Sequence, residues 1–208
     1  MKFLVPCGGF VNRSFGILTS PAHSSAVAGI KQGMPWAADN ECFTKEFNVT
    51  RFLDWLERME PYRDTCLFVA VPDVVGDARA TLERWMEMAW QVDAWPVAFV
   101  AQDGQEDLPF PESFDVLFIG GTTKWKLGPG ALECIRRGQA LGTGIHIGRV
   151  NWYKRYRYFA GLPGGEDFTC DGTRQRFEGI DKATEAWATY MERPRQLHLP
   201  VPGGNHRR

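Results

Sequence analysis

The feature that most constrains the fold of this chain is an alternation of short apolar runs with longer segments of helical periodicity. The runs are rich in β-forming residues and several are apolar almost throughout, which is typical of strands buried on both faces of a parallel sheet. The predicted strands are residues 3–6, 36–40, 66–73, 96–103, 116–121, 144–151 and 167–171. The predicted helices are residues 50–59, 77–91, 129–141 and 182–193. Strands that alternate with helices indicate an α/β fold.

Polar residues stand at the carboxyl ends of six successive runs, and they distinguish between the two common parallel architectures. They are Asp39, Asp73, Gln102 with Asp103, Gly120 with Gly121, Arg149 with Asn151, and Asp171. A doubly wound sheet concentrates its site near one switch point, whereas a (β/α) barrel draws its site from many strand ends. Because the chain has 208 residues and a full barrel has about 250, we predict a compact, trimmed TIM-like barrel.

The whole barrel is expected to form one domain over residues 1–193, followed by a flexible tail at 194–208 that is rich in Pro, Gly and Arg. The cysteines at 7, 42, 66, 134 and 170 are odd in number and form no C-x-x-C pair. This pattern predicts reduced thiols and no zinc site. The sequence has no apolar run of membrane-spanning length. A cytoplasmic protein without a membrane partner is therefore expected.

Three carboxylates among the strand-end residues are candidates for chemistry: Asp39, Asp73 and Asp171. Any one of them alone is more simply explained as a helix cap or a turn former, as we expect for Asp77 at the start of a helix. Three on one rim are less easily explained in this way. In such a pocket one carboxylate can attack a sugar carbon, while another moves protons or binds the donor edge of a ring.

Further strand-end residues have both a functional and a structural interpretation. The amide of Gln102 offers a donor and an acceptor to a purine edge. The backbone N–H groups of Gly120 and Gly121 suit a carbonyl oxygen, but the pair is equally typical of a plain βα turn. His146 lies within a predicted strand, where a single histidine is more often structural.

The basic residues are concentrated in one stretch, residues 122–157, which holds eight Lys and Arg against one Glu, although the whole chain has a net charge of −1. Such a patch can hold phosphates. Aromatic residues between 152 and 158 alternate with cations, which is typical of single-stranded nucleic-acid binding or of an amphipathic helix. The candidate DNA-binding residues are Lys124, Lys126, Lys154, Arg155, Arg157 and Arg174.

Six short motifs, taken in order, resemble the DpdA-type enzymes of phages and bacteria, which are DNA relatives of the tRNA-guanine transglycosylases. The motifs are Asp-Asn-x-x-Phe (39–43), Val-Pro-Asp-Val-Val-Gly-Asp (71–77), Phe-Val-Ala-Gln-Asp-Gly (99–104), Phe-Ile-Gly-Gly-Thr-Thr-Lys-Trp (118–125), His-Ile-Gly-Arg-Val-Asn (146–151) and Cys-Asp-Gly-Thr (170–173). The resemblance implies a pentosyltransferase that exchanges guanine in DNA for a 7-deazaguanine such as preQ0 or a derivative. In phages this modification protects DNA from restriction.

The resemblance also implies roles for individual residues. Asp171 is the implied nucleophile at C1′, which would form a covalent enzyme–DNA intermediate, and Asp39 is the implied general acid and base. The implied base-binding residues are Asp73, Gln102, Gly120, Gly121 and Asn40. Candidates for supporting or phosphate-contacting positions are His146, Arg149 and Asn151. The resemblance also implies a 7-deazaguanine base as co-substrate, and no cofactor is expected.

The chain departs from the tRNA enzymes in lacking their Cys-x-Cys-x-x-Cys zinc motif, so neither zinc nor tRNA is expected to bind. Two other functions remain open from the residues alone. One is a barrel enzyme that processes nucleosides or other N-glycosides as small molecules. The other is a non-catalytic nucleic-acid-binding module.

Overall fold

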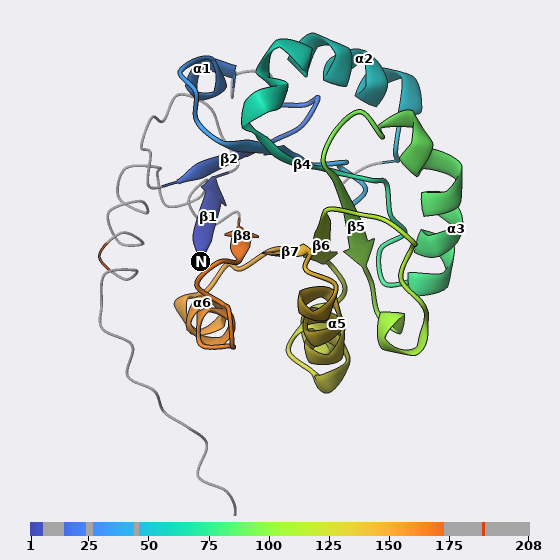
Figure 1. The fold of residues 1–208 in the computed structure, drawn as a ribbon, viewed down its shortest axis with the longest axis vertical. Coiled ribbons are helices and arrows are strands. Elements are labelled where there is room, and N and C mark those ends of the chain that lie inside the picture. Colours follow the sequence, from blue (N-terminus) through green and yellow to red (C-terminus); the bar gives the residue numbers. More distant parts are fainter. Residues whose placement is uncertain (6–14, 24–26, 44–45, 173–188, 190–208) are drawn as a thin grey trace, which may run out of the picture.

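The computed structural model of this chain describes residues 1–5, 15–23, 27–43, 46–172 and 189. Eight parallel strands follow one another in sequence order and close into a barrel, because β8 pairs with β1 (Figure 1). The strands are β1 (Lys2–Val5), β2 (Gly16–Thr19), β3 (Trp36–Ala38), β4 (Cys66–Ala70), β5 (Val97–Ala101), β6 (Val116–Ile119), β7 (Gly144–Ile147) and β8 (Thr169–Asp171). The predicted TIM-like α/β barrel is confirmed.

Helices surround the barrel on the outside (Figure 1). The α-helices are α1 (Val27–Lys31), α2 (Val49–Met59), α3 (Ala78–Met88), α4 (Thr123–Lys126), α5 (Pro129–Ala140) and α6 (Tyr153–Ala160). The 3₁₀ helices are η2 (Glu60–Thr65), η3 (Ala89–Gln91) and η4 (Gln105–Asp107). The connection from β5 to β6 contains only η4, so the helical cover is thin there, as expected for a trimmed barrel.

The N-caps of α2 and α3 show why these helices begin where they do. The side chain of Asn48 accepts a hydrogen bond from the backbone N–H of Arg51, and that of Asp77 accepts one from Ala80. Each cap satisfies a donor that the first turn leaves free. The expected capping role of Asp77 is confirmed.

One strand, β2, was absent from the prediction. Its four residues, Gly16–Thr19, are all buried, and they pair in parallel with β1 and β3. The segment is too short to stand out as an apolar run, but it supplies the eighth strand. The predicted helix at 182–193, apart from residue 189, and the predicted tail at 194–208 lie outside the described residues.

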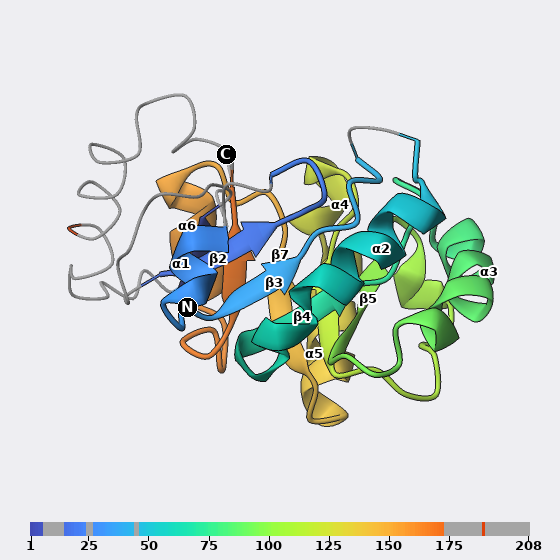
Figure 2. The same cartoon turned by 90° about the horizontal axis from the view of Figure 1, so that it is seen from above.

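Two apolar clusters fill the fold. The smaller cluster, with Leu4, Leu18, Ala37, Phe68 and Ala98, is formed by strand residues inside the barrel. The larger one lies between the strands and the helices; in it Trp36 of β3 contacts Trp55 of α2, with ring centroids 6.1 Å apart. Figure 2 shows α2 along the outside of β3 and β4. Because side chains fill the interior, an open site is expected only at the barrel's ends.

Candidate functional site

A cavity of about 370 Å³ lies at the carboxyl ends of the strands, within the usual size range for small-molecule sites. It brings together Asp39, Asp73 and Asp171, which are separated by more than 30 residues in the sequence. The other predicted site residues that line it are Asn40, Gln102, Gly120, Arg149, Asn151 and Arg155. Polar groups from six consecutive strands therefore share one cavity.

Asp73 is held by two side-chain amides. Asn40 Nδ2 donates to Asp73 Oδ1 at 2.8 Å and to the carbonyl oxygen of Val71 at 2.9 Å. Gln102 Nε2 donates to Asp73 Oδ2 at 2.5 Å. Burial raises the pKa of Asp73, and the two amide donors oppose that shift. The carboxylate is thus fixed in orientation, and each of its oxygens keeps a lone pair for a ligand.

The acceptor side of Gln102 is fully occupied within the protein. Gln102 Oε1 accepts from the backbone N–H groups of Gly76 and Gly121, each at 2.9 Å. One hydrogen of Gln102 Nε2 points to Asp73, and the other has no acceptor among the described residues. Gln102 therefore presents a donor to the cavity, next to the acceptor oxygens of Asp73.

The structure assigns Gly120 and Gly121 a different role from the expected one. The N–H of Gly120 donates to the carbonyl of Ala101 at 3.0 Å, and that of Gly121 to Gln102. Neither N–H is left for a ligand oxygen. Gly121 has φ +58, and a Cβ there would lie 2.3 Å from the ring of Trp125. The pair is a tight βα turn, which was the structural alternative from sequence.

Asp171, the last residue of β8, is supported from below by a buried histidine. His146 is 0% exposed; its Nε2 lies 3.2 Å from Asp171 Oδ1, and its Nδ1 lies 2.8 Å from Thr169 Oγ1. Burial lowers the pKa of His146, so the ring is neutral and carries one hydrogen. Placing that hydrogen on Nε2 avoids two lone pairs facing each other at Asp171. The hydroxyl of Thr169 then donates to Nδ1 at 2.8 Å in preference to its other acceptor, the carbonyl oxygen of Ile145 at 3.5 Å.

The two oxygens of Asp171 are consequently different. Oδ1 accepts from His146 and also from the backbone N–H of Arg149, at 2.9 Å. Oδ2 has no hydrogen-bond partner among the described residues. One oxygen is anchored, and the other is open to the cavity as a nucleophile would need to be.

Asp39 follows β3 and accepts one hydrogen bond, from the backbone N–H of Glu41 at 3.0 Å. Burial raises the pKa of Asp39 to about 6; the carboxylates of Asp171 and Asp73 add to the rise, and the Glu41 hydrogen bond opposes it. A carboxyl group with this pKa can give and take a proton near neutral pH.

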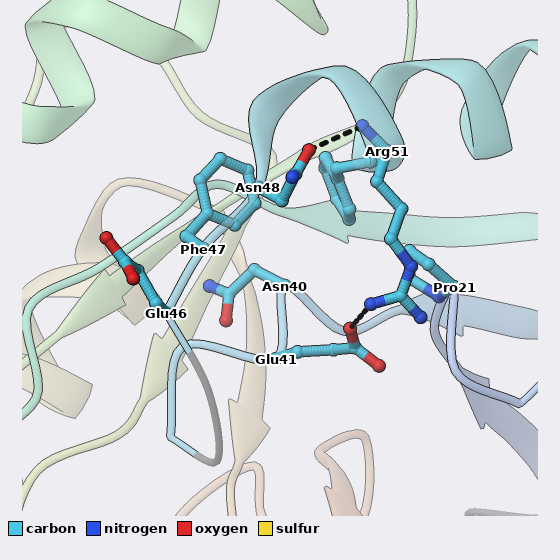
Figure 3. A pocket seen from close by; sticks show the side chains of 8 residues that line it. Pro21, Asn40, Glu41, Glu46, Phe47, Asn48 and Arg51 are labelled. Atoms are coloured by element: carbon cyan, nitrogen blue, oxygen red, sulfur yellow. Dashed lines mark hydrogen bonds and ion pairs between the residues drawn. The ribbon is translucent and has the colours of Figure 1, made fainter.

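The loop after β3 is fixed by Glu41, which has φ 63. Its carboxylate accepts from Ser20 Oγ at 2.7 Å and pairs with Arg51 of α2 at 3.2 Å. Figure 3 shows this pair beside Asn40, in a small hollow next to the main cavity. The anchor holds Asp39 and Asn40 at the rim.

Arg149 lies across the rim beside Asp171, with φ 57. Its guanidinium donates to the carbonyl oxygen of Gly121, and Cζ lies 4.1 Å from the ring centroid of Phe43. Phe43 is 61% exposed and lines the cavity, but it received no role from the sequence. The sequence did contain one indication of a role for Phe43. It lies four residues after Asp39, in a motif whose residues Asp39 and Asn40 also line the cavity.

The expected DNA-binding residues divide into four groups. Lys124, Lys154 and Arg157 are exposed, and Arg155 lines the cavity. For Lys126 the predicted contact with DNA is wrong, because the side chain is only 3% exposed. Its Nζ donates to the carbonyl oxygen of Gly148, and burial lowers the pKa of Lys126 to about 7. An ammonium enclosed in this way does not reach an external phosphate. Arg174 lies outside the described residues.

The aromatic and basic segment after β7 forms the amphipathic helix α6. Tyr156 and Phe159 are buried, whereas Lys154 and Arg157 face solvent. Trp152, at the N-cap of this helix, is 58% exposed. The segment is therefore a helix that buries Tyr156 and half-buries Tyr153, while Trp152, Tyr158 and the cations Lys154 and Arg157 remain on the surface.

No protein-family model, curated protein or solved structure matches the chain. Within the described residues, no three His, Cys, Asp or Glu side chains are grouped closely enough to hold a metal ion. No helix in this part of the chain has the length and apolar character needed to span a membrane.

Proposed function

We propose that this protein is a DNA-guanine transglycosylase, which exchanges guanine in DNA for a 7-deazaguanine through a covalent Asp171–deoxyribose intermediate. The observation that carries the proposal is the convergence of Asp39, Asp73 and Asp171 in one cavity at the carboxyl rim. The ordered motifs that resemble the DpdA-type enzymes supply the specific reaction. The surroundings of each carboxylate support a distinct task for it.

The pair formed by Asp73 and Gln102 is complementary to guanine. An acceptor oxygen of Asp73 lies next to the donor Nε2 of Gln102, 2.5 Å away. Guanine offers N1–H and O6 side by side, a donor followed by an acceptor, so both bonds form at once. Adenine presents the opposite polarity at these two atoms. It would leave the second Nε2 hydrogen of Gln102 and the remaining lone pair of Asp73 unmatched, which is costly in a buried site.

The order of residues around the rim matches the order of atoms around guanine. From β4 to β8 the rim presents Asp73, then Gln102 and Gly120, then Arg149, then Asp171. Around the base, the 2-amino group and N1 are followed by O6, then position 7, and finally N9 with its sugar carbon C1′. Asp39, from β3, completes the circle on the N3 side of the base. One pose therefore places each of these parts of the nucleotide beside the rim residues in the same order.

The first chemical step in this pose joins Asp171 to the sugar. Oδ2 attacks C1′ and forms an ester-like C1′–O bond, while the C1′–N9 bond breaks and its electron pair leaves with the base. Asp39 in its protonated form gives its proton to the departing guanine.

The second step reverses the first with a different base. Asp39, now a carboxylate, takes a proton from the incoming 7-deazaguanine, whose N9 attacks C1′. The C1′–O bond breaks, and its electron pair returns to Asp171. Two displacements retain the configuration at C1′.

The target guanine must leave the base stack before C1′ can be reached, so the substrate is flipped out or single-stranded. Lys154 and Arg157 on α6, together with Lys124 on α4, are exposed cations available to the backbone phosphates. Arg155 lines the cavity itself, where it can contact the phosphate of the flipped nucleotide.

The test is to trap the intermediate. The protein is incubated with a guanine-containing oligonucleotide, single-stranded or duplex, and a labelled 7-deazaguanine. We expect label in the DNA, a denaturation-resistant protein–DNA adduct, and attachment at Asp171 by peptide mass spectrometry. Asp171→Asn should abolish the adduct and the exchange. Turnover of free guanosine without DNA would favour the nucleoside-processing alternative, and DNA binding with neither adduct nor exchange would favour the non-catalytic one.

A further inference from the structure

Arg149 spans the gap between two parts of the site. Its backbone N–H donates to Asp171 Oδ1 at 2.9 Å, and its guanidinium donates to the carbonyl of Gly121. The residue thus runs along the cavity wall from the nucleophile on β8 to the turn after β6. A ligand group that lies in the cavity between Asp171 and Gly121 therefore faces the positive charge of Arg149.

The proposed pose places one particular edge of the base there. O6 lies near Gln102 and Gly120, at β5 and β6, and C1′ lies at Asp171 on β8. On the perimeter of the base, position 7 falls between O6 and N9. On the barrel, β7 falls between β6 and β8, so Arg149 faces position 7.

We infer that Arg149 selects the 7-substituent of the incoming base, favouring hydrogen-bond acceptors such as nitrile or carboxylate and rejecting a cationic aminomethyl group. This inference rests on the proposed function. Within the 7-deazaguanines that the resemblance implies, it assigns the choice of the 7-substituent to one residue.

The guanidinium group of Arg149 is held in place and still has N–H donors for a ligand. Phe43 stacks on the guanidinium at 4.1 Å, and the Gly121 carbonyl holds one end. Arginine has five N–H donors, of which the described residues take few. Arginine is also the usual partner of the O6 and N7 edge of guanine. The departing guanine, whose N7 is an acceptor, therefore fits the same cation, whereas an ammonium at position 7 is repelled by it.

The experiment compares four labelled bases with one DNA substrate: 7-cyano-, 7-carboxy- and 7-aminomethyl-7-deazaguanine, and guanine itself. For the wild-type protein we expect kcat/KM for the cyano base to exceed that for the aminomethyl base by at least about tenfold, as expected for an opposed like charge. Arg149→Gln should reduce this ratio to roughly threefold or less. Arg149→Lys should retain the preference, because the cation remains.

Controls separate this inference from other roles of Arg149. Arg155→Gln removes a second cation from the cavity wall, and it should lower kcat/KM for every base in parallel without changing the ratio. Arg149→Asn provides a second neutral variant, since Asn tolerates a positive φ better than most residues. Thermal unfolding of each variant shows that the compared proteins are folded.

The possible results show separately whether the proposed function fails or only the role inferred for Arg149. Absence of labelled guanine exchange in the wild-type protein would refute the proposed function itself. Guanine exchange together with an unchanged ratio in both neutral variants would overturn the inference alone. An equal loss for all bases in these variants would also overturn it, because Arg149 would then act only through Asp171 or a phosphate.

Discussion

At the scale of single residues, the catalytic task proposed for Asp39 comes with a cost in stability. Its pKa is raised from 3.8 to about 6 in the folded protein, so ionisation disfavours the fold. The contribution of this group to stability is complete below about pH 4 and is lost as the pH rises through about 6. Each pKa unit corresponds to about 1.4 kcal/mol, less where solvent at the cavity mouth screens the charge.

We predict that Asp39→Asn stabilises the protein above about pH 6, by about 1–3 kcal/mol, while abolishing exchange. The amide keeps the shape and can still accept from Glu41, but it does not titrate. Denaturant unfolding at about pH 7.5 and pH 4 measures the difference, which should vanish at the lower pH. Equal stability of the two proteins at both pH values would contradict the raised pKa.

A second prediction at this scale concerns the hydrogen bond between Thr169 and His146. Thr169→Val removes the hydroxyl that donates to His146 Nδ1, so the ring is no longer held with its hydrogen on Nε2 toward Asp171. We expect adduct formation to slow by roughly 10- to 100-fold, the equivalent of one charge-assisted hydrogen bond. Affinity for the base should be unchanged, because Asp73 and Gln102 are untouched.

Thr169→Ser is the matched control, since it keeps the hydroxyl and should restore the rate. Single-turnover rates measured beside the equilibrium affinity for the free base separate the two effects. Weakened base binding with an unchanged rate would show that the pair supports the fold of the cavity and not the orientation of Asp171.

At the scale of elements, the turn between β6 and α4 links the packing of Trp125 to Gln102, a proposed base-binding residue. Gly121 takes φ +58 there, with no room for a Cβ beside Trp125, and its N–H holds Gln102. Gly142, after α5, also has a positive φ, of +74, but an added Cβ there would meet nothing within 4 Å. The two glycines share a backbone requirement and differ in their surroundings.

We therefore predict that Gly121→Ala is more destabilising than Gly142→Ala. Each should lose about 1–2 kcal/mol from the left-handed conformation, and the first should lose more because Trp125 must move. Only Gly121→Ala should weaken binding of guanine. Thermal unfolding and base titration of both variants check this, and equal effects on stability would contradict the clash.

The elements also show what the sequence could reveal. Runs such as residues 66–70 and 97–101 are apolar throughout, so their strands and the polar residues that follow them were predictable. β2 was missed because four residues carry too little pattern, and only pairing with β1 and β3 makes them a strand. The burial of Lys126 depends on a carbonyl 22 residues away, at Gly148. Such long-range contacts leave no local signal.

At the scale of the whole molecule, a net charge of −1 means that any affinity for DNA arises from a local surface. Lys154 and Arg157 are exposed three residues apart on α6, and therefore share one face. Arg136, also in the basic stretch, is instead paired with Glu133 at 2.7 Å on α5. Lys154 and Arg157 are therefore more available to DNA phosphates than Arg136, although each carries one positive charge.

We predict that Lys154→Gln and Arg157→Gln each reduce the slope of log affinity for single-stranded DNA against log salt by about 0.7, the value for one phosphate contact. Arg136→Gln should leave the slope unchanged. Fluorescence anisotropy over a range of salt concentrations measures all three. An equal change in all three variants would indicate a diffuse field in place of a binding surface.

The closure of the barrel has a consequence for how this protein is made. Asp171 lies on β8, which is anchored between β7 and the first strand of the chain. A nascent chain that has emerged only as far as β7 already contains the residues proposed to bind the base, but it lacks Asp171, the proposed nucleophile. If the proposed function is right, the protein becomes reactive toward DNA only after β8 has been synthesised and has paired with β1.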